Sequence, residues 1–326
     1  MSLPPAPRRG RGIPPCRRKT IIVNEAGICT VEHLRHVYGD RTALEDISFS
    51  LHRGTVVGLV GANGSGKSTL LRILAGVQRA SAGRVEQFGT DISAHESVGR
   101  GVGAATDGMA MWPTWTVRKN LTYLARLSGA SRGDVARVAE LVDIAAEMRT
   151  RLSRLSLGNR QRLSLAAAIL VGTELVLLDE PMNGLDPDAR QRIRELLIQL
   201  SGEGRTVLLS SHDLHEVESS CSHLLVLDRG RLVFGGPTND FVGTHQMTIL
   251  RMSRADTDRA QVLLTHAGLH CRRDSSGAPV VFSHDASAAN RVLGEAGIPV
   301  LTSEERHATL EERFHDRPRQ PAHGEG

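Results

Sequence analysis

The sequence predicts an α/β protein in which helices cover a mainly parallel sheet, with a small α+β domain after it. Three observations lead to this prediction. Short apolar strand patterns alternate with helical patterns between residues 28 and 245. A glycine-rich loop stands between a buried strand and the helix that follows it. From residue 246 onward, a shorter strand–helix–strand pattern occurs twice in succession.

The first elements are predicted to be strands. An alternating pattern occupies residues 28 to 60, at Cys29, Val31 and His33 and again at Ile47, Phe49 and Leu51. Residues 55–60 form a continuous apolar run, which is typical of a strand buried on both faces. Residues 1–27 are rich in proline and arginine, so we expect a disordered tail there. A merely solvated tail, a mis-assigned start codon and a tail that contacts a membrane surface all stay open.

The residues between the buried strand and the next helix match the phosphate-binding pattern G-x-x-x-x-G-K-[ST]. They are Gly61, Ala62, Asn63, Gly64, Ser65, Gly66, Lys67, Ser68 and Thr69. Glycines let successive backbone N–H groups face one anion, and the start of the following helix, residues 70–75, adds a partial positive charge. We therefore expect Lys67 to reach the β- and γ-phosphates of a nucleotide and the Ser68 hydroxyl to bind Mg²⁺.

The remaining elements of this domain follow in order along the chain. Helical patterns occupy residues 117–150, 153–171, 189–200 and 214–220. Strand patterns occupy residues 174–178, 206–210 and 224–227. Ser131 is placed to be the N-cap of the helix over 133–142. This alternation predicts a mainly parallel sheet with both faces covered.

Two acidic residues end one of these strands, in the run Glu174-Leu175-Val176-Leu177-Leu178-Asp179-Glu180-Pro181. Two adjacent carboxylates at the end of an apolar strand are costly without a cation. We therefore expect Asp179 to hold Mg²⁺ or its water. We expect Glu180 to polarise the water that attacks the γ-phosphate.

Composition agrees with a globular protein and excludes several classes. Apolar residues make up 40% of the 326 residues and charged residues 23%. No apolar run reaches the ~18 residues that a membrane span needs, and residues 1–15 lack the apolar core of a secretory signal. The four cysteines show neither metal-ligand spacing nor a disulfide framework. The first 20 residues carry six basic side chains and no acid, so the rest of the chain, at −2, offers no basic face for nucleic acid.

Three further segments carry a family resemblance. The run Leu155-Ser156-Leu157-Gly158-Asn159-Arg160-Gln161-Arg162 resembles the LSGGQ-type signature of ATP-binding cassette (ABC) ATPases. Asn183-Gly184-Leu185-Asp186-Pro187 resembles the D-loop of this family, and Ser210-Ser211-His212-Asp213 resembles its switch. The resemblance covers about residues 28–240.

The resemblance implies a P-loop ABC ATPase domain at 28–245, with a parallel-sheet core, antiparallel strands and a helical subdomain at about 107–172. It implies ATP and Mg²⁺ as cofactors, Tyr38 as the ring that stacks on adenine, and His212 as the γ-phosphate sensor beside the catalytic Lys67 and Glu180. Members of the family pair head-to-tail around ATP. Ser156 and the Gly158 N–H would then bind the γ-phosphate from a second copy, Asp186 of the D-loop is a further nucleotide-binding residue, and we expect a homodimer.

One position departs from the family pattern. A glutamine normally stands before the segment that here runs over 112–121, and counting back places Asp107 there. The carboxylate of Asp107 is still a candidate catalytic group and Mg²⁺ ligand, but it is shorter and adds negative charge near the triphosphate. We expect slower hydrolysis or a stricter requirement for Mg²⁺.

Both tryptophans of the chain, Trp112 and Trp115, follow this position. In the resembling family this surface receives the coupling helix of a membrane permease, although packing inside the helical subdomain is the alternative. The run Ala308-Thr309-Leu310-Glu311-Glu312-Arg313-Phe314 resembles the LE-x-x-F tail of bacterial drug- and antibiotic-exporter subunits. The resemblance thus implies an ATPase at the cytoplasmic face of the membrane that powers a separately encoded exporter.

Other functions stay open on the sequence. The ATPase subunit of an importer or a lipid transporter would carry the same motifs. A soluble ABC protein acting on ribosomes or DNA generally has two cassettes or a long coiled coil, whereas this sequence has one cassette and no heptads. A simple G protein would need an N-K-x-D motif, and the sequence has none.

The C-terminal domain is predicted over 246–316, followed by a polar tail at 317–326. Strand patterns lie at 247–251, 268–269, 279–282 and 298–301, and helical patterns at 256–267 and 286–296. A β-α-β pattern that occurs twice predicts a small ferredoxin-like unit. Such a fold by itself assigns no function.

Overall fold

The computed structural model describes residues 27–93, 101–106, 111–242, 246–269, 271–273, 279–282, 286–307 and 310. Asp107, one of the predicted site residues, lies outside the described residues. The chain divides between Thr238 and Asn239 into two compact units. Each unit is described by itself.

The larger unit is built on a six-stranded sheet with the strand order β10-β9-β3-β8-β7-β6. The strands are β3 (Val56–Val60), β6 (Val102–Ala105), β7 (Leu175–Leu178), β8 (Thr206–Ser211), β9 (His223–Asp228) and β10 (Arg231–Pro237). All neighbours pair in parallel except β10, which pairs with β9 in antiparallel fashion at the edge. The predicted mainly parallel sheet is therefore confirmed.

A second, antiparallel sheet has the order β2-β1-β4-β5. Its strands are β1 (Cys29–Tyr38), β2 (Arg41–Leu51), β4 (Ala82–Gln87) and β5 (Thr90–Asp91). The predicted alternation is wrong at His33, whose φ of +48° and exposed side chain mark a bulge in the β1–β2 pairing. The bulge turns Leu34, in place of His33, into the core.

The helices of the larger unit are α1 (Lys67–Leu74), α2 (Val117–Ser128), α3 (Arg132–Leu141), α4 (Leu157–Val171), α5 (Pro187–Gly202) and α6 (Leu214–Ser220). Helix α7 (Thr238–Val242) begins at the last residue of this unit and so contains the division between the two units. Five helices of the larger unit, α2 to α6, begin at residues whose side chains cap them. Ser131 forms the predicted N-cap, as part of a capping box with Asp134. The helix predicted over 117–150 is interrupted, because Gly129 and Asp143 adopt left-handed conformations. The turns η1 (Ala145–Glu147) and η2 (Leu152–Arg154) follow this interruption.

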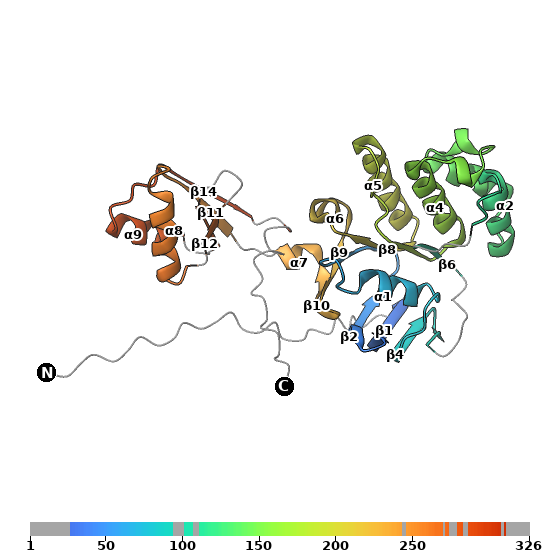
Figure 1. Cartoon of the computed structure of the whole chain (residues 1–326), viewed down its shortest axis with the longest axis horizontal. Coiled ribbons are helices and arrows are strands. Elements are labelled where there is room, and N and C mark those ends of the chain that lie inside the picture. The colour runs from blue at the N-terminus through green and yellow to red at the C-terminus, as the bar shows by residue number, and fades with distance from the viewer. Residues whose placement is uncertain are drawn as a thin grey trace. The chain divides into compact units, whose positions relative to one another are not determined.

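Helices cover both faces of the six-stranded sheet (Figure 1). Helices α4, α5 and α6 lie on one face, and α1 lies on the other, between the two sheets. Strands β3, β7 and β8 are buried along their whole length as a result. The approach of α4 to β6 is close, since a Cβ atom on Gly103 would overlap the backbone at Ala168 and Gly172.

The smaller unit is an antiparallel four-stranded sheet with two helices. The strands are β11 (Gln246–Arg251), β12 (Cys271–Arg273), β13 (Pro279–Phe282) and β14 (Thr302–His307), and the helices are α8 (Thr257–His266) and α9 (Ala286–Glu295). The order β12-β13-β11-β14 is the one that a ferredoxin-like unit has. The strand predicted at 298–301 is wrong, because β14 begins at Thr302 and the buried Ile298 packs into the core from the preceding loop.

Among the described residues, no helix has both the length and the apolar character of a membrane span.

Candidate nucleotide site

An open pocket of about 510 Å³ lies where β3, β7 and β8 end. Its lining residues come from the loops after these strands and from the β1–β2 hairpin: Tyr38, Arg41, Ala43, Asn63, Gly64, Gly66, Lys67, Ser68, Thr69, Glu180, Asn183 and His212. The carboxyl ends of parallel strands are where ligands bind in sheets of this kind. The pocket therefore collects most of the residues that the sequence assigned to nucleotide binding.

The phosphate loop is shaped by its glycines. Gly64 and Gly66 have φ values of +79° and +107°, a conformation that other residues adopt only with strain. A Cβ atom on Gly61 would overlap Leu227 O and Ser65 Oγ. The loop leads into α1, whose start has no side-chain cap. A buried hydroxyl, that of Ser65, has no hydrogen-bond partner among the described residues. Uncapped N–H groups at a helix start in a pocket fit a phosphate group.

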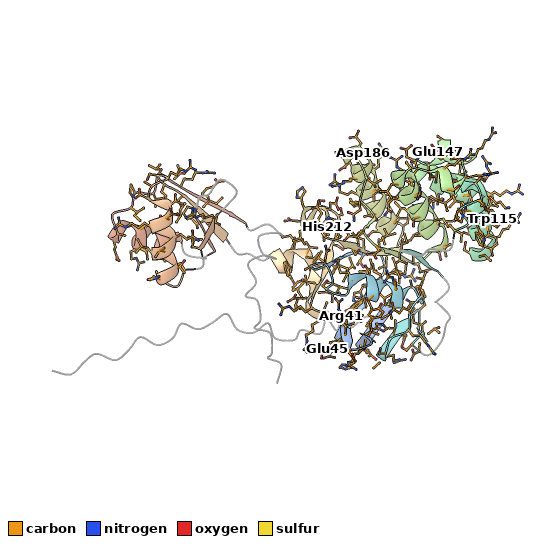
Figure 2. The ribbon with its side chains drawn as sticks, in the orientation of Figure 1. Arg41, Glu45, Trp115, Glu147, Asp186 and His212 are labelled. Carbon is orange, nitrogen blue, oxygen red and sulfur yellow. The ribbon has the colours of Figure 1, made fainter. Side chains whose placement is uncertain are left out.

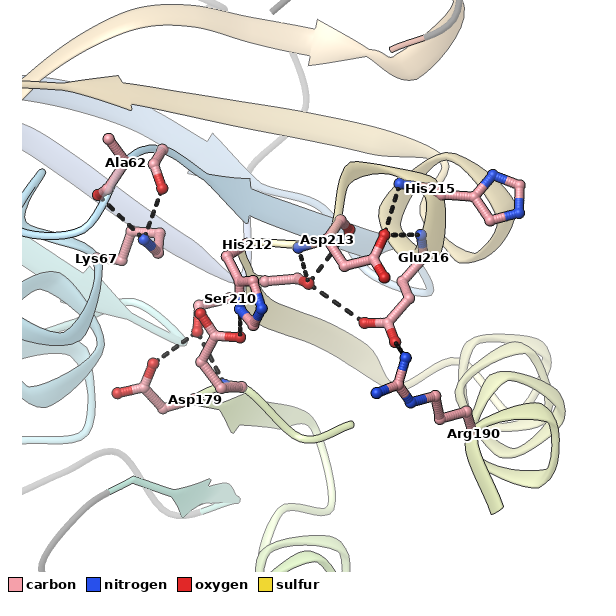
Figure 3. Close-up of polar contacts among 12 residues, drawn as sticks. Ala62, Lys67, Asp179, Arg190, Ser210, His212, Asp213, His215 and Glu216 are labelled. Carbon is pink, nitrogen blue, oxygen red and sulfur yellow. Dashed lines mark hydrogen bonds and ion pairs between the residues drawn. The ribbon is translucent and has the colours of Figure 1, made fainter. Parts of the chain in front are cut away.

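Lys67 is anchored by its own loop. It is only 7% exposed, and its Nζ donates to Gly61 O at 2.7 Å and to Ala62 O at 3.3 Å (Figure 3). Burial lowers the pKa of Lys67, and the negative charges of Glu180 and Asp179 only partly offset this effect. A bound phosphate would supply the counter-charge that this ammonium group needs.

The side chains of Glu180 and His212 contact each other in the pocket. Glu180 Oε2 lies 2.8 Å from His212 Nδ1. Glu180 has a φ of +50°, which is a strained conformation for this residue type. Its backbone is held on both sides, since its N–H donates to Ser210 Oγ at 2.9 Å and its carbonyl accepts from Gln161 Nε2 at 3.2 Å. The chain thus fixes a carboxylate and an imidazole side by side at the end of the sheet.

Asp179 lies behind this pair and does not line the pocket. Its Oδ1 accepts a hydrogen bond of 2.6 Å from Ser210 Oγ. Ser210 therefore orders both acidic residues, a role that the sequence did not reveal. The only signal was its place in the run Ser210-Ser211-His212-Asp213 at the end of the strand.

Tyr38 contributes a ring to the rim of the pocket and is 45% exposed. Its hydroxyl donates to Gln78 Oε1 at 2.7 Å, and its ring makes an edge contact with His36 at 4.5 Å between centroids. Burial alone would raise the pKa of Tyr38, but hydrogen bonds with Thr69 and other neighbours hold it below its ordinary value. The exposed ring is available for stacking.

Three predicted nucleotide-binding residues lie away from the pocket. Ser156 and Asp186 are exposed N-caps: Ser156 Oγ accepts from Asn159 N at 3.2 Å, and Asp186 Oδ1 accepts from Ala189 N at 2.8 Å. The Ala189 N–H group also lowers the pKa of Asp186. Gly158 lies beside the 184–185 turn. The structure of one chain thus assigns capping roles to Ser156 and Asp186.

Sequence reasoning missed other lining residues. Arg41 and Ala43 stand in the hairpin after Tyr38, and Asn183 opens the D-loop run. The guanidinium of Arg41 lies near Gly64 of the phosphate loop. No motif marks this arginine, although its position just after Tyr38 on the β1–β2 hairpin is a signal that sequence reasoning could have used.

The two tryptophans form an aromatic cluster with Tyr123. Trp112 stacks on Trp115 at 4.4 Å, and Tyr123 meets both rings edge-on at 4.7 and 5.7 Å. Lys119 Nζ lies 4.0 Å from the centroid of the Trp115 ring. Trp112 is 36% exposed, and Trp115 lies beside α2 (Figure 2). The cluster is therefore partly open to the surface.

Comparisons with known proteins agree with this geometry. Residues 44–183 match the family model described as ABC transporter. A Nod factor export ATP-binding protein of Neorhizobium galegae is 31% identical over 289 residues, which cover 85% of this chain and 81% of the relative. A daunorubicin resistance ATP-binding protein of Streptomyces coeruleorubidus is 34% identical over 297 residues, which cover 87% and 94%. A bacitracin transport ATP-binding protein of Bacillus licheniformis is 30% identical, with 86% and 94% covered.

Solved structures show the same fold. The ATP-binding subunit of an ABC transporter matches with a TM-score of 0.61 and 26% identity, over 66% of this chain and 91% of that one. A bacterial Atm1-family ABC exporter with ATP bound matches with a TM-score of 0.59 and 28% identity, over 66% and 39%. The chain therefore belongs to the ABC transporter family, as one of its ATP-hydrolysing subunits.

Proposed function

We propose that this chain powers a separately encoded membrane permease that exports a drug, antibiotic, peptide or lipid-like compound. The observation that carries the proposal is the convergence of Lys67, Glu180 and His212 on one pocket in a chain of this family. Its relatives are named for Nod factor export and for bacitracin transport, linearmycin resistance and daunorubicin resistance. These names support export as the direction of transport.

The pocket has the parts that ATP requires. The phosphate loop and Lys67 would hold the phosphates, and Tyr38 would stack on the adenine. The hydroxyl of Ser68 and the carboxylate of Asp179 are oxygen ligands of the kind that Mg²⁺ prefers, and Asp107 keeps its proposed role as a further ligand. The ion would neutralise charge on the phosphates.

Hydrolysis needs a base and a sensor. Glu180 is placed to take a proton from the attacking water. His212, at 2.8 Å, would orient that carboxylate and contact the γ-phosphate. The strained backbone of Glu180 and its two backbone hydrogen bonds support a fixed position for the base.

The site is completed by a second copy of the chain. Ser156, Gly158 and Asp186 do not line the pocket of their own chain, and they lie at or beside the starts of α4 and α5. A head-to-tail homodimer would bring these helix starts to the γ-phosphate of the partner. The Trp112–Trp115 cluster would receive the permease, which places the chain at the cytoplasmic face of the membrane.

The test is the variant Glu180→Gln in the purified full-length chain. We expect ATP turnover to fall at least ~100-fold, since the general base is lost, while ATP binding is retained and an ATP-dependent dimer accumulates in size-exclusion chromatography. Glu195→Gln, an exposed change on α5, is the matched control and should behave like the wild type. If Glu180→Gln hydrolyses ATP as fast as the wild type, Glu180 is not the general base. A wild-type chain that neither binds nor hydrolyses ATP would overturn the proposal.

A further inference from the structure

An ion pair between a half-exposed arginine and a buried glutamate joins two helices behind the candidate site. Glu216, on α6, is 7% exposed, and its Oε1 lies 3.1 Å from Arg190 Nη1 on α5. Burial raises the pKa of Glu216, and the nearby charge of Asp213 acts in the same direction. A partly exposed ion pair adds little net stability, because desolvation of the carboxylate and screening by water offset the attraction. In the described structure neither residue lines the pocket.

One end of the pair holds the turn that carries Glu180. Arg190 Nε donates to Leu185 O at 3.2 Å. Leu185 closes the turn that begins at Glu180, since Leu185 N donates to Met182 O and Asn183 N donates to Glu180 O. The guanidinium thus contacts Glu216 with one nitrogen and the Glu180 turn with another.

The other end of the pair holds the segment that carries His212. Glu216 Oε2 lies 3.3 Å from Ser211 Oγ, whose single proton is shared between this carboxylate and Asp213 O at 3.2 Å. The same Ser211 oxygen accepts from Asp213 N at 3.0 Å and so spans the backbone on both sides of His212 (Figure 3). The 2.8 Å contact between His212 and Glu180 then closes a ring of interactions through both helices.

We propose that Arg190 and Glu216 are positioning residues, which hold His212 against Glu180 by fixing the two backbone segments that carry them. The inference rests on the roles proposed above for Glu180 and His212. The pair acts at a distance from the nucleotide, so it sets the rate of hydrolysis and leaves nucleotide binding alone. It also links the end of β8 to the 180–185 turn, so the two segments move together.

The experiment measures kcat and KM for ATP in the full-length variants Arg190→Gln and Glu216→Gln, each with and without His212→Ala. We expect each single change to lower kcat about 5- to 20-fold with KM altered less than about 2-fold. In the His212→Ala background neither change should lower kcat further, because residues that act through one another are not additive. Arg190→Lys keeps a positive charge beside Glu216 but lacks the planar guanidinium that contacts two partners at once. Its kcat should therefore lie between those of the wild type and Arg190→Gln. Arg194→Gln, at a half-buried arginine of the same helix whose guanidinium bonds to Gln191, should match the wild type.

A second measurement does not depend on turnover. In ¹⁵N-histidine-labelled protein, the ring signals that disappear in His212→Ala belong to His212. These signals should shift in Arg190→Gln and in Glu216→Gln and stay in place in Arg194→Gln. Equal losses of kcat in both backgrounds, or unshifted His212 signals, would show that the pair has a purely structural role. A wild-type chain without ATPase activity would instead contradict the proposed function, and the histidine signals would still decide this inference.

Discussion

At the scale of single residues, Lys67 shows how the loop prepares a cation for phosphate. Its ammonium group is buried and bonded to two carbonyl oxygens of the loop. We expect Lys67→Ala to weaken ATP binding about 10- to 100-fold, because charge-assisted hydrogen bonds contribute about 1.5–3 kcal/mol. Lys67→Arg should not restore binding, since a planar guanidinium does not fit between phosphates as a compact ammonium does. Titration with a fluorescent ATP analogue measures both affinities, and wild-type affinity in Lys67→Ala would contradict the assignment.

The raised pKa of Glu216 predicts that its contribution to the free energy of unfolding depends on pH. Burial, and then the charge of Asp213, raise the pKa of its carboxyl above the unfolded-state value, while Arg190 and Ser211 oppose the shift. Between the two pKa values the folded chain binds more protons than the unfolded chain, so this contribution is present at low pH and is lost as pH rises. Glu216→Gln does not titrate. The thermal midpoint of the wild type minus that of the variant should therefore fall over the pH range that begins at the ordinary glutamate pKa of 4.5 and extends above it. A difference that is constant across this range would show that the carboxyl titrates normally.

The residues that sequence alone could predict are those that a local pattern marks. The spacing of the phosphate loop marked Lys67, and the acidic strand end marked Glu180. Ser210 and Arg41 escaped prediction because their partners are distant in sequence: Ser210 bonds to Asp179, and Arg41 reaches the phosphate loop. Such contacts exist only after β7 and β8 have paired and the β1–β2 hairpin has folded.

At the scale of elements, strands and helix caps were predictable and irregularities were not. The buried strand over 56–60 and the Ser131 cap follow from apolar runs and short capping patterns. The bulge at His33 could not be foreseen, because it depends on pairing with β2. The start of β14 at Thr302 was missed because the buried Ile298 looks like a strand residue, although it enters the core from a loop.

The aromatic cluster of Trp112, Trp115 and Tyr123 predicts a surface that binds the permease. Trp112 lies at the start of the segment that carries this cluster, where Asn120 fixes its backbone by two hydrogen bonds. We expect Trp112→Ala to weaken copurification with the permease by about 30-fold or more, since a central tryptophan of an interface contributes about 2 kcal/mol or more. ATP affinity should be unchanged, because Trp112 does not line the pocket. Leu127→Ala, at an exposed apolar residue of α2, is the control. If copurification is unchanged, the cluster only packs the helical subdomain and does not bind the permease.

At the scale of the whole molecule, each unit has a core of its own. The larger unit buries a cluster that includes Leu34, Leu59 and Leu177, and the smaller one buries a cluster around Leu250 and Leu293. All residues that line the pocket fall between positions 38 and 212. The sequence predicts a domain boundary at residue 245. A boundary near this position implies that the nucleotide site folds without the smaller unit.

Truncation tests this independence. A chain that ends at Val242 keeps α7, in which Thr238 bonds to Cys221 O and Phe241 is buried. We expect it to fold, to bind ATP within about 3-fold of the full chain, and to unfold within a few degrees of it, since its core is intact. A chain that ends at Asp228 is the matched comparison, because it loses β10 and the bond from Gly230 N to Ser65 O at 3.0 Å in the phosphate loop. That chain should lose ATP binding, because the phosphate loop needs this backbone hydrogen bond to keep its shape. If the chain that ends at Val242 also fails to bind ATP, the smaller unit takes part in forming the site, and the boundary does not separate two independent domains.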